Sequence, residues 1–500
     1  MNAIRFLLGQ KLIELESVSP TLTVLNYLRY EQKKIGTKEG CAEGDCGACT
    51  VGIAELKDGQ LHYRAVNACI MFLVTLDGKQ LLTVEDLKTA DGNFHPVQQS
   101  MVDCHASQCG FCTPGFVMSG FAEFQNRQCS PKNRLKTMSD EYQTTQLTQI
   151  FAGNLCRCTG YGPIIEAGKS WLEQAENTPP QDRACIVAVL KAIEPLESKQ
   201  QRSDEQTYIQ PSSVSELTEV LAQNPNATLL AGGTDVGLWV TKQHKILNQV
   251  IYLGQIEALK QIECSSNRLE IGAAVTYSEA MPILIQHFPM MEEYLYRHSS
   301  TQIRNSGTIV GNIANGSPIG DMPPALIALN AQITLTSQTG QRIILLENYF
   351  ISYGQQDRRP DEFIEKVSIP LLGKSSALFK VYKISKRFEQ DISSVSAAFY
   401  IELDDTQHIQ TARLCYGGMA GTPLRATLTE QTLIGQLWTE PTLTDAALLL
   451  AEDFSPLSDF RASKEYRLTI AMNLLKKFFI QSQDQSPPTQ LSITGDVTCA

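Results

Sequence analysis

Residues 40–49 read Gly40-Cys41-Ala42-Glu43-Gly44-Asp45-Cys46-Gly47-Ala48-Cys49, and a fourth cysteine, Cys69, follows further along the chain. Three thiols in one glycine-rich loop, with a fourth from a neighbouring element, are typical of the C-x4-C-x2-C…C ligand set of a 2Fe–2S cluster. The glycines give the backbone the freedom to bring N–H groups close to the sulfur atoms. A structural zinc site is the alternative, but zinc ligands usually come in two C-x2–4-C pairs. We therefore predict a 2Fe–2S cluster on Cys41, Cys46, Cys49 and Cys69.

Four more cysteines follow in two short motifs, Cys109-Gly110-Phe111-Cys112 and Cys156-Arg157-Cys158. Pro114 and Pro163 come shortly after them, where helices can begin, and a helix N-terminus stabilises a nearby thiolate. The spacing taken alone is compatible with zinc as well as with a second 2Fe–2S cluster. The other six cysteines have no evident partner, and we interpret them as ordinary buried or exposed thiols: Cys104, Cys129, Cys185, Cys264, Cys415 and Cys499.

The cysteine distribution divides the chain into a cysteine-rich front and a cysteine-poor remainder. Ten of the fourteen cysteines lie in the first 158 residues. The front begins with short strands and a helix near 23–33, and then becomes helical, with helix starts predicted at Thr113 and Ser139 and a polar loop over 125–137. A Pro-, Gln-, Lys- and Glu-rich stretch near 176–206 is predicted as a linker, broken by a short apolar helix over 185–193.

A strand-like run further on ends in paired glycines, Leu229-Leu230-Ala231-Gly232-Gly233-Thr234-Asp235-Val236. Paired glycines let backbone amides approach a pyrophosphate, and the threonine hydroxyl adds a donor. The motif is not the G-x-G-x-x-G of a Rossmann unit, and an ordinary glycine turn would give the same pattern. Residues 302–313, QIRNSGTIVGNI, again combine small residues with hydroxyls. The two segments together predict a phosphate or ribityl cradle.

These motifs resemble the iron–sulfur and flavin regions of the molybdenum hydroxylases, a family that includes xanthine dehydrogenases and aldehyde oxidases. The resemblance rests on GCAEGDCGACTV (40–51), QCGFCTPGF (108–116), AGNLCRCTGY (152–161), the two cradle segments and residues 416–426, and it covers about residues 4–480. It favours iron over zinc for the second group of cysteines, and it predicts clusters on Cys41, Cys46, Cys49, Cys69, Cys109, Cys112, Cys156 and Cys158.

The resemblance implies a multidomain α+β fold. The expected order is a β-grasp 2Fe–2S ferredoxin-like domain (1–80), a four-helix 2Fe–2S domain (81–175), a linker (176–206), a vanillyl-alcohol-oxidase-like FAD-binding domain (207–374), a C-terminal α+β flavoprotein domain of the CO dehydrogenase type (375–482) and a disordered tail (483–500).

The resemblance also implies a set of flavin-binding residues. Asp321 is expected on the ribose side, Lys383 near the flavin and Ile364 as a backbone contact, while His298 stands where relatives often carry an aromatic residue. The full expected set is Leu229, Leu230, Ala231, Gly232, Gly233, Thr234, Asp235, Val236, His298, Thr308, Ile309, Val310, Gly311, Asn312, Asp321, Ile364 and Lys383.

The function implied by the resemblance is electron transfer by an NAD-dependent oxidoreductase. A partner subunit with molybdopterin would hydroxylate the substrate, and this chain would pass electrons through two 2Fe–2S clusters to FAD and then NAD⁺. No substrate-hydroxylating residue is expected here, since the chain leaves no length for a large molybdopterin-binding region, and a heterotetramer with two of each chain is implied. The alternatives are another substrate in the same family, a stand-alone NADH-dependent iron–sulfur flavoprotein reductase, or a zinc protein without a redox role.

The composition is that of an ordinary globular protein, with 43% hydrophobic and 19% charged residues. A net charge of −11 argues against nucleic acid or anionic membrane as a partner. No apolar run reaches the roughly 18 residues needed to cross a membrane. The N-terminus lacks the features of a signal peptide, so we expect a cytoplasmic protein whose clustered cysteines serve metal or redox chemistry.

Overall fold

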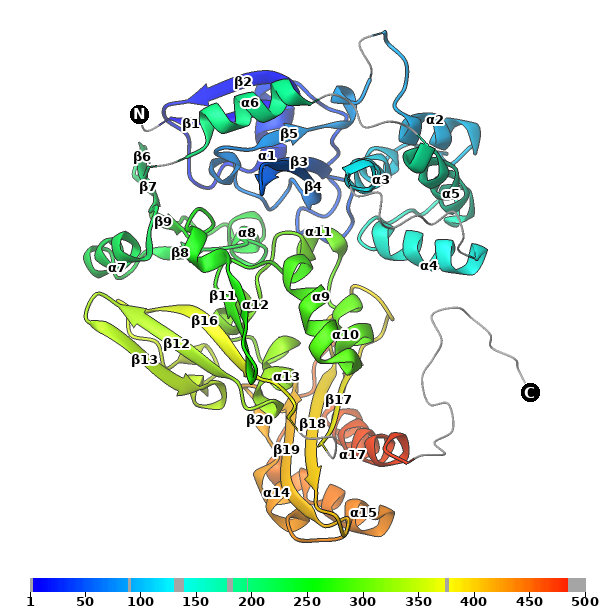
Figure 1. The fold of residues 1–500 in the computed structure, drawn as a ribbon, viewed down its shortest axis with the longest axis vertical. Helices are drawn as coiled ribbons and strands as arrows, with labels where there is room; N and C mark the ends of the chain where they lie inside the picture. Colours follow the sequence, from blue (N-terminus) through cyan, green and yellow to red (C-terminus); the bar gives the residue numbers. More distant parts are fainter. Residues whose placement is uncertain are drawn as a thin grey trace.

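The computed structural model describes residues 3–88, 91–129, 139–177, 183–195, 197–373 and 377–483. Figure 1 shows four parts in chain order, which we name the β-grasp domain (3–88), the helical domain (91–177), the central domain (197–373) and the C-terminal domain (377–483). The multidomain α+β fold expected from the sequence is confirmed. No helix within the described ranges is long and apolar enough to cross a membrane. The predicted tail beyond residue 483, with Cys499, lies outside them.

The β-grasp domain is a five-stranded mixed sheet in the order β2-β1-β5-β3-β4. The pair β1–β5 is parallel and the other pairs are antiparallel. A short helix packs on the sheet, and Thr23 caps it by accepting the Asn26 N–H at 3.2 Å. The elements are β1 (Ile4–Leu8), β2 (Lys11–Leu15), α1 (Val24–Asn26) with a π-helical turn (Tyr27–Glu31), β3 (Thr50–Lys57), β4 (Gln60–Asn67) and β5 (Gln80–Leu82).

The helical domain packs four helices around Trp171 and Phe116, both fully buried. As predicted, α3 begins at Thr113, and Ser139 caps α4. The helices are α2 (Pro96–Asp103), α3 (Thr113–Cys129), α4 (Asp140–Phe151) and α5 (Gly162–Asn177).

The start of the predicted loop over 125–137 is wrong, because residues 125–129 are the last residues of α3. Their polar composition suggested a loop, but Asn126 bonds both backbone groups of Tyr63 in β4, at 2.9 and 2.7 Å, and so fastens the helix to the sheet. Residues 130–137 of this prediction lie outside the described part of the chain.

A buried histidine begins the helical domain. The His95 Nδ1 accepts the Val97 N–H at 3.3 Å and thereby caps α2, while its Nε2 lies 3.1 Å from the Gln125 amide. The ring also packs edge-on against Phe124, with 4.8 Å between centroids. Burial, with a smaller contribution from the Arg183 charge, lowers the pKa of His95 to about 4. The folded domain therefore requires the neutral imidazole.

Acid is expected to destabilise the helical domain through His95. An unfolded histidine takes up a proton near pH 6.5 and the folded one only near pH 4, so stability is lost as the pH falls between these values. From pH 8 to pH 5.5 the loss is about 1.4 kcal/mol. The non-titrating cap variant His95→Asn should gain this amount relative to the parent over the same interval, measured by unfolding at both pH values. An unchanged difference would contradict the prediction.

The segment between the helical and central domains is more structured than a free linker. α6 (Ala184–Ile193) contacts β1 and β3, and its Leu190 and Ile193 are buried. β6 (Lys199–Ser203) pairs with β7 (Gln206–Gln210) and so belongs to a sheet of the central domain. The short apolar helix predicted over 185–193 is α6, and its buried apolar side chains explain why this stretch is held against the β-grasp sheet (Figure 1).

The central domain holds two main sheets. One has the order β6-β7-β9-β8 with parallel β7, β9 and β8, and the other is antiparallel with the order β10-β11-β16-β12-β13. Its further strands are β8 (Thr228–Leu230), β9 (Gln249–Tyr252), β10 (Ile262–Cys264), β11 (Arg268–Gly272), β12 (Gln332–Ser337), β13 (Gly340–Leu345), β14 (Phe350–Ser352), β15 (Gln355–Gln356) and β16 (Phe363–Pro370). Its helices are α7 (Val214–Gln223), α8 (Val236–Thr241), α9 (Tyr277–His287), α10 (Glu292–Tyr296), α11 (Thr301–Arg304), α12 (Ile309–Asn315) and α13 (Met322–Ala328).

The C-terminal domain is an antiparallel sheet, β17-β18-β19-β20, covered by helices and placed at the far end of the molecule from the β-grasp domain (Figure 1). Its core is aromatic, with Phe399 packed against Tyr416 and Phe478. The elements are β17 (Ala377–Ile384), β18 (Val395–Leu403), β19 (Ile409–Gly417), β20 (Leu424–Arg425), α14 (Thr427–Leu433), α15 (Glu440–Leu448), α16 (Leu450–Asp453) and α17 (Lys464–Gln481).

Candidate cofactor sites

The first four cysteines converge although Cys69 is distant in sequence. The Cys41 thiol lies within hydrogen-bonding reach of the Cys46 and Cys69 thiols, and the Cys69 thiol within reach of Cys49. The Cys41 sulfur also accepts the backbone N–H groups of Asp45 and Cys46, at 3.4 and 3.3 Å. Four thiols with backbone donors aimed at sulfur form the surroundings that a 2Fe–2S cluster requires.

The glycines of this loop are required by its geometry. A Cβ on Gly40 would lie 2.7 Å from the Cys46 sulfur, so a larger residue would displace a candidate ligand. Gly44 and Gly47 adopt positive φ angles of 80° and 70°, which favour glycine. The loop is thus wrapped closely around the sulfur atoms, and it fits the cluster that the sequence predicts.

The second four cysteines come together in two pairs at the edge of the helical domain. The Cys109 and Cys158 sulfurs are 3.6 Å apart, and the Cys112 and Cys156 thiols are within hydrogen-bonding reach. Thr159 contacts the Cys156 sulfur through its N–H at 3.5 Å. Among the described residues, no three His, Cys, Asp or Glu side chains converge on a single-ion position. The pairwise arrangement of thiols suits a two-iron centre in which each iron takes two thiolates.

The two cysteine groups touch through the backbone. The Cys46 carbonyl accepts the N–H of Leu155, the residue before Cys156, at 3.0 Å. The Gly47 carbonyl accepts the Asn154 side-chain amide at 3.2 Å. One hydrogen bond therefore joins a candidate ligand of the first group to the neighbour of a candidate ligand of the second.

A cavity of about 930 Å³ lies below the first cysteine loop, between the central and C-terminal domains. Most of the expected flavin residues line it, namely Leu229, Ala231, Gly232, Gly233, Thr234, Asp235, Val236, His298, Thr308, Val310, Gly311, Asn312 and Ile364. Leu230 and Ile309 do not line it but are buried in the core. Asp321 and Lys383 do not line it either.

The two glycine segments form one wall of the cavity because they pack against each other. A Cβ on Gly232 would lie 2.0 Å from the Ser306 carbonyl oxygen, so the β8–α8 turn meets the second segment backbone to backbone. Thr308 caps α12 by accepting the Gly311 N–H at 2.9 Å. Two buried polar atoms at the wall, the Asn312 Oδ1 and the Tyr277 hydroxyl, have no hydrogen-bond partner among the described residues. A nucleotide cofactor, with its hydroxyls and ring nitrogens, would satisfy such atoms.

A buried charge cluster stands behind the cavity wall. The Asp321 carboxylate accepts from the Lys383 Nζ at 2.6 Å, from the Ser393 hydroxyl at 2.6 Å and from the His298 Nδ1 at 3.0 Å. Burial opposes ionisation of Asp321, but the Lys383 and His298 contacts hold its pKa well below the usual range. Burial lowers the pKa of His298, and the Asp321 contact opposes this. His298 stacks on Tyr277 at 4.2 Å and is the member of this cluster that reaches the cavity.

The sequence did not indicate several cavity residues that come from other parts of the chain. Glu43, Gly44 and Asp45 of the first cysteine loop line it, and burial raises the pKa of Asp45. A basic and aromatic group from the central and C-terminal domains also lines it: Arg358, Lys386, Arg387, Phe460 and Arg461. No local motif marks these residues, because only the fold brings them together.

Comparisons with known proteins agree with this geometry. Residues 7–74 match the 2Fe-2S iron-sulfur cluster binding domain family, 83–169 the [2Fe-2S] binding domain family, 200–372 the FAD binding domain in molybdopterin dehydrogenase, and 380–482 the CO dehydrogenase flavoprotein C-terminal domain. Two cysteine groups beside a flavin cavity thus define an iron–sulfur flavoprotein.

The chain belongs to the molybdenum hydroxylase family. It is 30% identical to xanthine dehydrogenase/oxidase of Gallus gallus over 97% of this chain and 41% of that protein. It is equally, 30%, identical to aldehyde oxidase 1 of Bos taurus, over 95% of this chain and 39% of that protein. The chain therefore spans about two fifths of the length of these relatives. Reconstituted CO dehydrogenase from Oligotropha carboxidovorans is a similar solved structure, with a TM-score of 0.51 and 26% identity, covering 54% of this chain and 94% of that one.

Proposed function

We propose that the chain is the electron-transfer subunit of a xanthine dehydrogenase, working with a separate molybdopterin-binding subunit. That partner would hydroxylate xanthine or hypoxanthine, and the electrons would leave through this chain to NAD⁺. The eight cysteines would hold two 2Fe–2S clusters and the cavity would hold FAD. The 2Fe–2S clusters carry one electron each, and FAD connects these one-electron carriers to the two-electron hydride chemistry of NAD⁺.

The observation that carries the proposal is the continuity of the three sites. The Cys46 carbonyl bonds the residue before Cys156, and the same cysteine loop supplies Glu43, Gly44 and Asp45 to the cavity. The first cysteine group therefore stands between the second group and the cavity. Cys109 and Cys158 of the second group are exposed, so this end is open to a partner that delivers electrons.

Different residues of the cavity suit different parts of a dinucleotide cofactor. The Gly232–Gly233 turn and Thr308 would hold the phosphates, as their backbone and hydroxyl donors are suited to do. Asp321 and Lys383 keep His298 in place from behind, with the charges compensated in the buried pair. The lining also carries four basic side chains, Arg358, Lys386, Arg387 and Arg461, beside four acidic ones, Glu43, Asp45, Asp235 and Asp391. The basic side chains are the groups suited to pair with the phosphates of an anionic dinucleotide.

The purified chain, carrying its clusters and FAD, should reduce an artificial dye with NADH and form no urate from xanthine. The reason is that the electron-transfer sites lie on this chain whereas substrate hydroxylation would need the partner's molybdenum. Dye reduction and urate are both read spectrophotometrically, and addition of the partner should restore xanthine-dependent reduction of the clusters. Formation of urate by this chain alone would contradict the two-subunit proposal. NADH activity in a chain that neither co-purifies with a molybdenum subunit nor gains xanthine-dependent cluster reduction when one is added would favour the stand-alone reductase.

A second candidate is the same electron-transfer role for an aldehyde or a heteroaromatic compound. The equal identity to an aldehyde oxidase and to a xanthine dehydrogenase favours keeping it. Reduction of the clusters in the two-subunit complex, measured with xanthine and with an aldehyde as separate electron donors, distinguishes the two candidates.

A further inference from the structure

One buried glutamine joins three domains. Gln302 belongs to α11 of the central domain and is 1% exposed. Its Nε2 donates toward the Thr50 hydroxyl of the β-grasp domain at 3.3 Å, the Ser119 hydroxyl of the helical domain at 3.2 Å and the Asn154 Oδ1 at 3.0 Å. All three acceptors are themselves buried. The two hydrogens of Nε2 are shared among these three acceptors, and the Gln302 Oε1 has no hydrogen-bond partner among the described residues. The donor side of the amide therefore holds the elements of the three domains in one relative placement.

Two of the acceptors, Thr50 and Asn154, stand close to candidate cluster ligands in the sequence, and the third, Ser119, bonds one of these two. Thr50 directly follows Cys49, and its hydroxyl donates to the Gly47 carbonyl at 2.6 Å. Asn154 comes two residues before Cys156 and bonds the same carbonyl, and Ser119 donates to the Asn154 Oδ1 at 2.6 Å. The Gln302 amide therefore touches both cysteine loops at the point where they meet.

The packing around this amide leaves no room for adjustment. A Cβ on Gly153 would lie 2.0 Å from the Gln302 Oε1, and a Cβ on Gly47 would lie 2.0 Å from the Gly153 carbonyl oxygen. Close-packed contacts of this kind transmit displacements instead of absorbing them.

The same segment also forms the cavity wall. Ile303 lines the cavity, and the Ser306 carbonyl packs against Gly232 of the glycine turn. A shift of Gln302 would therefore move the cavity wall relative to the cysteine loops.

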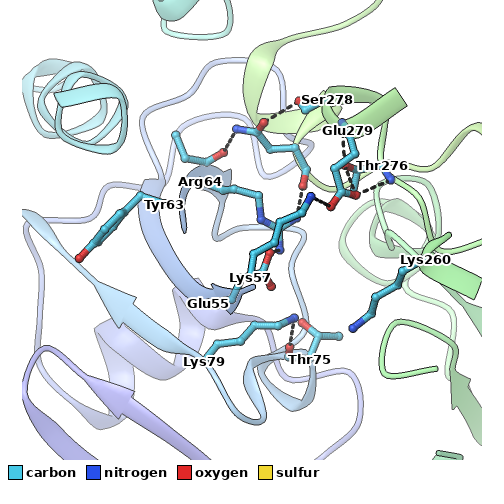
Figure 2. A network of polar contacts seen from close by, with 12 residues as sticks. Glu55, Lys57, Tyr63, Arg64, Thr75, Lys79, Lys260, Thr276, Ser278 and Glu279 are labelled. Atoms are coloured by element: carbon cyan, nitrogen blue, oxygen red, sulfur yellow. Dashed lines mark hydrogen bonds and ion pairs between the residues drawn. The ribbon is translucent and has the colours of Figure 1, made fainter. Parts of the chain in front are cut away.

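A second network of polar contacts joins the β-grasp domain to the central domain and includes none of the candidate cluster ligands (Figure 2). Arg64 pairs with Glu55 at 2.8 Å and donates to the Asn305 carbonyl, and the Asn305 amide donates to the Ala65 carbonyl at 2.9 Å. At its edge Lys57, with its side chain 57% exposed, pairs with Glu279 at 3.2 Å. The Lys57–Glu279 pair crosses the same domain boundary without touching a cysteine loop, so it provides a matched control.

We propose that Gln302 is a positioning residue for electron transfer. Its amide holds the wall of the flavin cavity and the two cysteine loops at fixed positions relative to one another. The inference rests on the part of the proposed function that places FAD and both clusters on this chain, and it needs neither NAD⁺ nor a molybdenum partner. The step at stake moves one electron from reduced FAD to an oxidised cluster, where one ferric ion becomes ferrous.

The test uses Gln302→Met, which keeps the length of the side chain and removes its donors. FAD in the full chain is photoreduced by a flash with triethanolamine as the electron donor, and the transfer to the clusters is followed by absorbance. We expect the transfer to slow at least about tenfold, because the rate of electron transfer falls steeply as the two centres move apart and the variant removes the hydrogen bonds that hold them in place. Cluster and flavin potentials should stay at the parent values, and amide hydrogen exchange should rise over residues 46–50 and 152–156.

The control Lys57→Met should match the parent in the rate of electron transfer, in the cluster and flavin potentials and in amide hydrogen exchange. The proposal is overturned if Gln302→Met, with its cofactors bound, transfers electrons at the parent rate. It is also overturned if shifted potentials account for the slower rate, or if Lys57→Met slows it equally. Should Gln302→Met yield no folded protein, Ser119→Ala removes one acceptor of the amide. This variant should slow the transfer at least about threefold, which corresponds to about half of the increase in activation free energy behind a tenfold loss. An unchanged rate would overturn the proposal.

Discussion

Replacing Cys69 with serine should remove the first 2Fe–2S cluster and lower the iron content from about four to about two atoms per chain. Cys69 is only 3% exposed, and its thiol lies between those of Cys41 and Cys49. A serine hydroxyl fits the space, but it holds its proton far more firmly than a thiol and does not replace a thiolate ligand. Iron and acid-labile sulfide analysis of the purified variant measures the loss.

The loss should extend to folding and to electron flow. Ligand loops of this kind gain stability from the metal centre they bind, so the β-grasp domain of the variant should unfold at a lower temperature. Since the first cysteine group stands between the cavity and the second group, photoreduced FAD in this variant should no longer reduce the remaining cluster.

Cys104→Ser is the matched control for this prediction. Cys104 is partly buried against the core of the helical domain and belongs to neither cysteine group. Its replacement should leave about four irons per chain and normal electron flow. Full iron content in Cys69→Ser, or equal loss in both variants, would contradict the assignment of the first cluster.

The sequence predicted the first cysteine group because most of its chemistry is local, whereas the second group needed the family resemblance to favour iron over zinc. A cluster needs several thiols in one short loop, so the spacing from Cys41 to Cys49 carries the information, and the glycine segments before Val236 and after Ser306 are local in the same way. The fold class followed from the resemblance that these motifs support. Helix starts such as Ser139 were predicted because an N-cap bond is made within three residues.

The features of the site that the sequence did not predict depend on contacts between residues that are distant in the chain. Nothing near Gln302 in the sequence indicates Thr50, 252 residues away, or Asn154, 148 residues away. The cavity residue Arg461 and the cysteine-loop residue Asp45 likewise share a wall only because the domains fold together. Composition misled at Gln125 and Asn126, whose polar groups are used in tertiary contacts and do not end the helix.

Replacing Gly232 with alanine should weaken FAD binding and lower the FAD content of the purified chain. The added Cβ would stand 2.0 Å from the Ser306 carbonyl oxygen, 2.7 Å from its carbon and 2.8 Å from the Gly307 Cα, all of which are backbone atoms. Since backbone cannot turn aside as a side chain can, the glycine turn and the second segment must separate. Overpacking of this kind costs about 1–3 kcal/mol, which corresponds to a weakening of FAD binding by about 5- to 150-fold if the cost falls on the cradle.

Gly373→Ala tests whether this loss is specific to the cradle. No atom of the described residues lies within 4 Å of the position its Cβ would take, and its φ lies outside the range that favours glycine, so this variant should bind FAD like the parent. The FAD released on denaturation, measured by fluorescence per mole of protein, compares the variants. The iron content should stay at about four in both, because the cysteine groups are untouched. Parent-like FAD content in Gly232→Ala would show that the pyrophosphate does not lie against this turn, and the cavity would then have to bind its cofactor through other residues.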